Sequence, residues 1–287
     1  MSMQIKAGSR SDTLADSIER IIPETCGQSP EKYLEYLRHF FAYNVVRTLL
    51  SEQSSVLEIG CGDGYGASYL SQYVQHITGL DIYENVIHHA SQKYQSERCA
   101  FQVYDGLHIP YQSQMYDAAI AFQVIEHIRD DRYFLTELQR VIKPDGMCIL
   151  TTPNGMYRIK QGAKPWNRFH VREYYPNELE RILKTLFADV RIWGIRGNEQ
   201  IQQREKTRIT RIQKWIALDP LNVRRLLPFS FEHFVRIVLR KLFRKERHHN
   251  QEFLKMYTIN DYFLVKDQVD DCLDLLAICR TDSSRNV

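Results

Sequence analysis

The feature that most constrains this chain is a glycine-rich loop directly after a short apolar run. The apolar run is residues 56–59, and the loop reads G-C-G-D-G-Y-G at residues 60–66. A loop of this kind between a strand and a helix lies at the edge of an open α/β sheet, where ligands bind. Glycines there let the backbone approach a ligand closely and adopt positive φ angles. We therefore expect residues 56–66 to belong to a ligand-binding α/β domain.

The rest of the chain alternates predicted strands with predicted helices. Helical spacing of apolar residues occurs at 31–50, 67–74, 85–94, 131–142 and 176–186. Runs typical of strands occur at 56–59, 76–80, 101–104, 118–122, 147–150, 190–195 and 275–279. Such alternation predicts parallel pairing with helices on both faces. We expect an α/β fold with a Rossmann-like, seven-stranded, mostly parallel sheet.

Charge is unevenly distributed along the chain. Residues 196–256 contain 15 Lys and Arg against 6 Asp and Glu, a balance of +9, whereas the whole chain carries +3. An asymmetry of this size marks a separate functional unit. We expect a helical N-terminal extension or lid at 1–50, a ligand-binding core at 51–195, a basic helical insert at 196–260, and a C-terminal strand within 261–287 that completes the core.

Composition and termini indicate the compartment. No run approaches the roughly 18 apolar residues that a membrane span needs, and the first residues lack the apolar core of a signal peptide. The six cysteines are scattered, without a C-x-x-C pair. Thiols in this pattern are typical of a reducing compartment, so we expect a cytoplasmic protein.

Acidic residues beside the glycine loop favour one class of ligand over another. A dinucleotide fingerprint has the spacing G-x-G-x-x-G and places a pyrophosphate on the next helix. Here the spacing is G-x-G-x-G, Asp63 lies inside the loop, and Glu58 precedes it. Carboxylates repel a pyrophosphate but suit a ligand with a positive sulfonium and ammonium. The sequence therefore favours S-adenosylmethionine and argues against a nucleotide-dependent oxidoreductase.

The loop and three later segments resemble the class I S-adenosylmethionine-dependent methyltransferases. Asp81 ends the second predicted strand, D-G at 105–106 follows the third, Q-V-I-E-H at 123–127 follows the fourth, and R-V-I-K-P-D-G-M at 140–147 precedes the fifth. The resemblance covers about residues 55–195. It implies that Asp81 accepts the ribose hydroxyls and that Asp105 meets the adenine. The N-terminal segment resembles methyltransferases of polysaccharide and sugar-nucleotide pathways.

These arguments together define an expected cofactor site. Its residues are Glu58, Gly60, Cys61, Gly62, Gly64, Asp81, Ile82, Asp105, Gly106, Phe122 and Gln123.

Two histidines are predicted as catalytic residues. Methyl transfer is an in-line displacement, so alignment supplies much of the acceleration, and a base can remove the proton of an acceptor hydroxyl. His127 follows the fourth strand, and His170 lies between the fifth strand and the next helix. As structural alternatives, His127 caps the following helix and His170 orders its neighbours. Some relatives bind a divalent ion through E-x-x-E-H; because Gln123 replaces the first acid, the sequence predicts no metal site.

The basic insert contains a predicted amphipathic helix at 231–245. Its apolar residues fall on one face, and its Lys and Arg cluster away from that face. Such a helix can pack on the domain, bind an anionic membrane surface, bind a partner, or cover a phosphate-bearing substrate. Its aromatics do not form an interleaved stacking platform, which disfavours nucleic acid as a partner.

The predicted activity is methyl transfer from S-adenosylmethionine to a hydroxyl of a small-molecule or sugar/glycan-type acceptor. The alternative acceptor is a nitrogen of a specialised metabolite, and a macromolecular substrate ranks third. From different classes, a nucleotide-dependent oxidoreductase and a non-catalytic cofactor-binding adapter remain as hypotheses.

Overall fold

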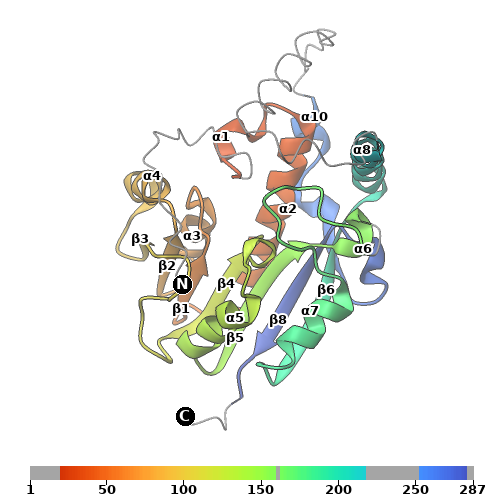
Figure 1. The fold of residues 1–287 in the computed structure, drawn as a ribbon. Coiled ribbons are helices and arrows are strands. Elements are labelled where there is room, and N and C mark those ends of the chain that lie inside the picture. Colours follow the sequence, from red (N-terminus) through yellow and green to blue (C-terminus); the bar gives the residue numbers. More distant parts are fainter. Residues whose placement is uncertain (1–19, 160–161, 218–251, 283–287) are drawn as a thin grey trace.

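An eight-stranded sheet organises the computed structural model, which describes residues 20–159, 162–217 and 252–282 (Figure 1). The strand order is β3-β2-β1-β4-β5-β8-β6-β7. The strands are β1 (Ser55–Ile59), β2 (His76–Asp81), β3 (Cys99–Val103), β4 (Tyr116–Phe122), β5 (Ile142–Pro153), β6 (Asp189–Gly197), β7 (Tyr262–Val265) and β8 (Asp274–Arg280).

The helices of the described residues lie between these strands in sequence. The α-helices are α1 (Pro23–Cys26), α2 (Pro30–Arg47), α3 (Tyr65–Leu70), α4 (Glu84–Tyr94), α5 (Asp131–Val141), α6 (Gly155–Arg158), α7 (Pro176–Leu183), α8 (Glu199–Ala217) and α10 (Phe253–Met256). Short 3-10 turns are found at η2 (Ile125–His127), η4 (Ile259–Asp261) and η5 (Val269–Asp271).

The first five strands of the sheet order, β3 to β5, pair in parallel. Strand β8 is inserted antiparallel between β5 and β6, and β7 pairs antiparallel with β6 at the edge. The carboxyl ends of β1, β2, β4 and β5 therefore meet at one edge of the sheet, which is where ligands bind in open α/β folds.

Successive residues of the central strands are buried on opposite faces because side chains alternate along a strand. In β4, Ala118 and Ile120 pack with residues of α2 and α3, whereas Ala119 and Ala121 pack with residues of α5 and α7. Figure 1 shows α5 and α7 in front of the sheet. Burial on both faces explains why these strands are continuous apolar runs in the sequence.

The predicted α/β class, with a Rossmann-like, mostly parallel sheet and helices on both faces, is confirmed. The predicted number of strands is wrong, because β7 makes eight rather than seven. Strand β7 has four residues, lies at the sheet edge and leaves Phe263 45% exposed. It is therefore not buried on both of its faces, whereas the central strands are.

Only part of the basic insert belongs to the described residues. Its first helix is α8, and the amphipathic helix predicted at 231–245 lies outside them. Among the helices that are described, none has the length and apolar character required to cross a bilayer.

Helix α2 is fixed to the C-terminal strand by a buried ion pair. Arg38 Nε lies 2.7 Å from Asp274 Oδ2, and the two side chains are 9% and 3% exposed. The Tyr262 hydroxyl also donates a hydrogen bond to the Leu34 carbonyl of α2 at 2.8 Å. These two contacts hold α2 against β8 and β7.

Replacing Arg38 with Met should strongly destabilise the protein, because Asp274 would keep a buried charge without its partner. Removing one partner of such a pair costs about 3–5 kcal/mol. We expect Arg38→Met to lower the free energy of unfolding by about that amount in a urea titration followed by circular dichroism. The control Arg191→Met breaks an ion pair whose side chains are 66% and 44% exposed, so it should change stability little. Equal losses from both variants would contradict a structural role for the buried pair.

Candidate functional site

The glycine loop between β1 and α3 folds over the end of β2. The N–H groups of Gly60 and Cys61 donate hydrogen bonds to the Leu80 carbonyl at 2.7 and 3.0 Å. The N–H of Gly62 donates to Asp81 Oδ2 at 3.2 Å. Backbone donors of the loop therefore hold the carboxylate of Asp81 directly beside it.

The glycines of the loop have different roles. Gly62 has φ 54°, and a Cβ there would meet no atom within 4 Å, so this side of the loop is open to a ligand. A Cβ on Gly60 (φ 73°) would lie 2.6 Å from Val124, and one on Gly64 would meet side chains of α4 and β3 at 2.9 Å. Cys61 is buried against β2. Of the predicted loop residues, Gly62 is thus placed to approach a ligand, and the others support packing.

Glu58 lies buried beneath this loop. Its Oε1 accepts a hydrogen bond from the Tyr43 hydroxyl. Burial raises the pKa of Glu58 to about 7; the Tyr43 hydrogen bond opposes this rise, and the charge of Asp81 adds to it. A cation bound nearby favours the ionised form of such a group, so Glu58 is suited to a positively charged ligand.

Tyr43 is a site residue that the sequence analysis missed. It comes from α2, and its ring lies 4.8 Å from that of Phe122 at the end of β4. It also occupies the space beside Gly66, where a Cβ would lie 2.0 Å from its Cζ. The sequence predicts the helix, but no local motif signals that one of its tyrosines reaches the glycine loop.

Asp81 retains acceptor capacity for a ligand. Besides the Gly62 N–H, its carboxylate accepts the Tyr83 N–H at 3.1 Å. It is 7% exposed, and burial raises its pKa. Because an ionised carboxylate can accept about four hydrogen bonds, Asp81 can still receive both hydroxyls of a ribose.

Exposed apolar side chains surround the next part of the site. Ile82 is 50% and Leu107 is 65% exposed, and Gly106 (φ 79°) lies so near Ile82 that a Cβ would be 3.0 Å away. Asp105 Oδ1 accepts the N–H groups of Leu107 and His108, both at 2.8 Å, which shapes this loop. An apolar surface beside an acid fits a purine ring with an amino group.

Asp63 does not face the ligand side of the loop, contrary to the electrostatic argument from sequence. Its carboxylate lies 3.1 Å from His89 Nε2 and 3.2 Å from Lys93 Nζ, and it accepts the Tyr94 hydroxyl at 3.2 Å. These partners all belong to α4. The acids that can act on a ligand at this loop are therefore Glu58 and Asp81.

The predicted residues after β4 lie against β5. Gln123 has φ 55°, its N–H donates to the Thr151 carbonyl at 2.8 Å, and its Nε2 donates to Thr151 Oγ1 at 3.4 Å. This strained turn directs the following residues, 124–127, across the ends of β4 and β5. Together with the open Gly62, the Asp81 carboxylate and the apolar rim, it forms a surface that fits S-adenosylmethionine.

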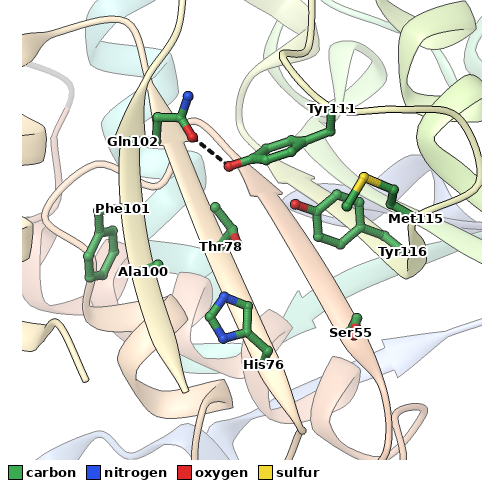
Figure 2. Close-up of a pocket in the computed structure, with 9 residues that line it drawn as sticks. All are labelled: Ser55, His76, Thr78, Ala100, Phe101, Gln102, Tyr111, Met115 and Tyr116. Atoms are coloured by element: carbon green, nitrogen blue, oxygen red, sulfur yellow. Dashed lines mark hydrogen bonds between the residues drawn. The ribbon is translucent and has the colours of Figure 1, made fainter. Parts of the chain in front are cut away.

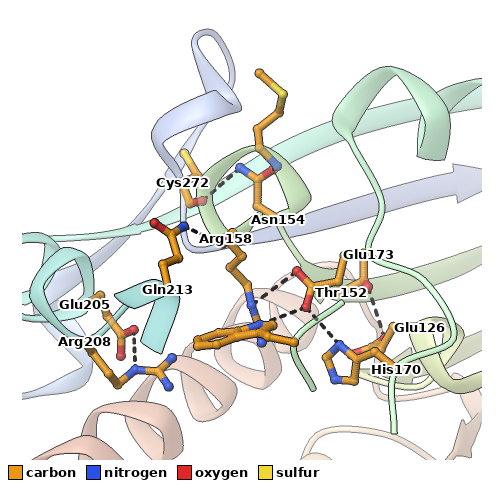
Figure 3. Close-up of polar contacts among 12 residues, drawn as sticks. Glu126, Thr152, Asn154, Arg158, His170, Glu173, Glu205, Arg208, Gln213 and Cys272 are labelled. Atoms are coloured by element: carbon orange, nitrogen blue, oxygen red, sulfur yellow. Dashed lines mark hydrogen bonds and ion pairs between the residues drawn. The ribbon is translucent and has the colours of Figure 1, made fainter. Parts of the chain in front are cut away.

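The two predicted catalytic histidines meet next to this surface. The rings of His127 and His170 lie 4.9 Å apart at 85°. His127 Nδ1 is 3.1 Å from the Phe169 carbonyl, and His170 Nδ1 is 3.2 Å from Glu173 Oε1. Figure 3 shows His170, Glu173 and Arg158 joined in a network of polar contacts. The structure therefore brings together residues 43 positions apart in the sequence.

Glu126 completes this group of polar side chains. It is fully buried, and its Oε2 accepts a hydrogen bond from the Thr152 hydroxyl at 3.1 Å (Figure 3). Burial raises its pKa to about 8, which the Thr152 hydrogen bond opposes. The sequence indicated Glu126 only as a neighbour of His127.

A cavity of about 400 Å³ lies elsewhere, on the face of β1–β3 (Figure 2). It is lined by Ser55, His76, Thr78, Ala100, Phe101, Gln102, Tyr111, Met115 and Tyr116. Ser55, His76 and Tyr116 begin their strands, so the cavity extends toward the end of the sheet opposite the glycine loop. It contains none of the predicted site residues.

Comparisons with known proteins agree with this geometry. Residues 57–150 match the family model described as a methyltransferase domain. A probable S-adenosylmethionine-dependent methyltransferase of Mycolicibacterium smegmatis is 33% identical over 172 residues, which are 60% of this chain and 64% of that protein. A fatty-acid O-methyltransferase of the same organism is 30% identical over 119 residues, covering 41% of this chain and 42% of that protein. The chain thus spans less than two thirds of the length of either relative.

Two solved structures share the fold. A Thermotoga maritima protein described as an S-adenosylmethionine-dependent methyltransferase, possibly acting on histamine nitrogen, has a TM-score of 0.53 at 14% identity and covers 91% of this chain and 100% of its own. The [4+2]-cyclase SpnF has a TM-score of 0.54 at 18% identity and covers 86% of this chain and 81% of its own.

The family match, the relatives and the arrangement of the glycine loop with Glu58 and Asp81 lead to one assignment. Residues 57–150 form a methyltransferase domain, and the relatives that share this part of the chain are named as S-adenosylmethionine-dependent methyltransferases.

Proposed function

We propose that this protein methylates an oxygen of a small-molecule or glycan-type acceptor, and that His127 and His170 face that acceptor. The observation that carries this proposal is the position of the histidine pair, which lies just beyond the turn at Gln123 and Val124. Val124 packs on Gly60 of the glycine loop. Residues 124–127 therefore connect the glycine loop, where the cofactor would bind, to the histidine pair, which would face the acceptor.

Each histidine is oriented by a contact at Nδ1. A carbonyl oxygen can only accept, so His127 Nδ1 carries a proton and donates it to the Phe169 carbonyl at 3.1 Å. His170 Nδ1 donates in the same way to Glu173 Oε1 at 3.2 Å. This arrangement leaves Nε2 as the basic nitrogen of both rings. A base held by a carboxylate is a recurrent arrangement in catalysis by proton transfer.

Bound S-adenosylmethionine supplies an electrophilic methyl group on a positive sulfur. The chain contributes alignment through the glycine loop and Asp81, and it contributes a proton acceptor through the histidine pair. A positioned base accelerates such a step by about 10²–10⁴-fold. The fatty-acid O-methyltransferase among the relatives supports oxygen as the acceptor atom.

Release of S-adenosylhomocysteine tests the proposed activity. Purified full-length protein should release it with at least one member of a panel of sugars, phenols and carboxylic acids. A matched panel of amines should give no release above the rate without acceptor. Turnover on amines alone would replace oxygen by nitrogen as the acceptor atom, and binding of cofactor without turnover on either panel would favour a non-catalytic adapter.

Asp81→Ala should abolish cofactor binding. It removes two charge-assisted hydrogen bonds to the ribose, each worth about 1.5–3 kcal/mol, so the dissociation constant should rise more than about 100-fold in a calorimetric titration. The control Asp189→Ala removes a half-exposed acid of β6 that pairs with Arg191, and it should leave the affinity unchanged. Wild-type affinity in Asp81→Ala would mean that the ribose binds elsewhere.

Cofactor binding should become tighter as pH rises toward about 7. The pKa of Glu58 is raised to about 7 in the free protein, and a bound cation favours its carboxylate form, so binding releases protons below that pH. Calorimetry in two buffers of different ionisation enthalpy measures this release.

Two substitutions separate Glu58 from other titrating groups. Glu58→Gln should remove this part of the pH dependence. Tyr43→Phe removes a hydrogen bond that lowers the pKa of Glu58, and it should move the midpoint to higher pH. A pH profile unchanged in both variants would contradict a role for Glu58 in binding the cation.

His170→Ala should spare cofactor binding and lower turnover. The residue belongs to the acceptor side of the site, so kcat should fall by about 10²–10⁴-fold, while the dissociation constant of S-adenosylmethionine stays within error. The control His88→Ala changes an exposed residue of α4 that contacts Gln92, and it should alter neither quantity. Loss of cofactor affinity in His170→Ala would place this histidine in the cofactor site instead.

A further inference from the structure

Glu126, His127 and His170 form a group with the composition of a metal site. One oxygen of Glu126 and one nitrogen of each histidine lie within 4.8 Å of one another. Glu126 comes from the turn after β4, whereas His170 comes from the segment between α6 and α7. In the sequence, Gln123 lacks the carboxylate that would be one of three metal ligands. The tertiary structure supplies His170 as the third ligand in its place.

A buried oxygen points to a missing partner in this group. Glu126 is fully buried, and its Oε1 has no hydrogen-bond partner among the described residues. A buried polar atom without a partner costs about 1–3 kcal/mol, and more when it is charged. The nearby Arg158 does not fill this role, because its guanidinium is directed to Glu173 Oε2 at 3.4 Å. A bound cation would satisfy this oxygen.

Each of the three side chains is held by an outer hydrogen bond. Glu126 Oε2 accepts from Thr152 Oγ1, His127 Nδ1 donates to the Phe169 carbonyl, and His170 Nδ1 donates to Glu173. Metal-ligating histidines almost always donate their other N–H to a carboxylate or a backbone carbonyl, and ligating carboxylates are hydrogen-bonded in turn. Figure 3 shows the contacts of Glu126 with Thr152 and of His170 with Glu173.

The geometry points to a binding site for a divalent first-row transition-metal ion, held by Glu126 Oε1 and by Nε2 of His127 and His170. Imidazole nitrogens suit Zn²⁺ and its neighbours, whereas Mg²⁺ prefers an all-oxygen site. Three protein ligands leave coordination positions open, as in catalytic rather than structural sites.

The ligands need only a small movement to close on an ion. Around a tetrahedral Zn²⁺ with metal–ligand distances of about 2.0–2.1 Å, the ligand atoms lie about 3.3 Å apart. The present separations of up to 4.8 Å therefore require the ligand atoms to approach one another by up to about 1.5 Å, which side-chain torsions can supply.

The role of the ion rests on the proposed function. An ion with open positions beside the acceptor polarises a hydroxyl oxygen as a Lewis acid and lowers the pKa of the hydroxyl. An acceptor of this kind must place a hydroxyl oxygen on the ion, so we expect an alcohol, a phenol or a diol. In the loaded protein Nε2 of each histidine binds the ion and is no longer a proton acceptor. The ion then takes over the activation of the acceptor hydroxyl that the histidine pair has in the metal-free protein, and the hydroxyl proton leaves to water.

Cobalt provides a direct measurement that needs no acceptor. Chelator-treated, untagged full-length protein is titrated with Co²⁺ and followed by visible absorption, and parallel calorimetric titrations use Zn²⁺ and Mg²⁺. We expect one Co²⁺ or Zn²⁺ per chain and no saturable binding of Mg²⁺ at the same concentrations. The absence of stoichiometric Co²⁺ and Zn²⁺ binding would overturn the inference.

Substitutions locate the ion. Glu126→Gln, His127→Ala and His170→Ala should each weaken Co²⁺ binding at least 100-fold. Thr152→Val preserves shape but removes the outer hydrogen bond of Glu126, and it should weaken binding by about 10–100-fold. The double variant His248→Ala/His249→Ala changes an adjacent histidine pair of the basic insert and should bind as the wild type does. Wild-type affinity in His127→Ala and His170→Ala would place the ion elsewhere and refute the site.

A titration with S-adenosylmethionine on the same samples separates the two proposals. Variants that bind the cofactor normally are folded, so their loss of Co²⁺ is specific to the ion site. Wild-type protein that binds the cofactor but no metal would end the metal inference and leave methyl transfer intact. Protein that binds the metal but not the cofactor would end the proposed function and leave the ion site intact.

Discussion

Three carboxylates, Glu58, Asp81 and Glu126, are kept almost fully out of water at or just beyond the carboxyl ends of β1, β2 and β4, and the rest of the site depends on this burial. Their hydrogen bonds come from neutral donors: the Tyr43 hydroxyl, backbone N–H groups and the Thr152 hydroxyl. Neutral donors hold the side chains in place without adding a positive charge of their own. Burial raises the pKa of Glu58 to about 7 and that of Glu126 to about 8, so a cation bound nearby favours the ionised form of both groups. This edge of the sheet therefore remains an environment that stabilises positive charge, which distinguishes it from a site for pyrophosphate.

Local patterns predicted most of the scaffold and the cofactor side of the site. The central strands are visible in sequence because both of their faces are buried, and the glycine loop and Asp81 are visible because their spacing is local. Tyr43 and the pairing of His127 with His170 could not be predicted, because both depend on which distant segments the fold brings together. Asp63 illustrates the opposite error: its position in the loop is correct, but the chain turns its carboxylate toward α4.

The fold by itself does not fix the chemistry. A cyclase and a methyltransferase both share this architecture with the chain at TM-scores of 0.54 and 0.53. The two proteins share one scaffold, on which sites for different reactions can be built. In the reaction proposed for this chain, the acceptor side of the site is built by the segment after β4 and the segment after α6, which supply Glu126, His127 and His170. Polar contacts orient Glu126, His127 and His170, whereas their neighbours Ile125 and Tyr174 belong to the apolar core and fix both segments to the sheet.

The ion pair between Arg38 and Asp274 links an early helix to a late strand. During synthesis the glycine loop and β1 emerge more than 200 residues before Asp274, and domains generally fold as units once their parts are available. The ion pair that fixes α2 can form only after β8 has been made, and Tyr43 is carried by that same helix. The anchoring of the helix that carries Tyr43 is therefore completed only after β8 has been synthesised, although the glycine loop and β1 are made much earlier.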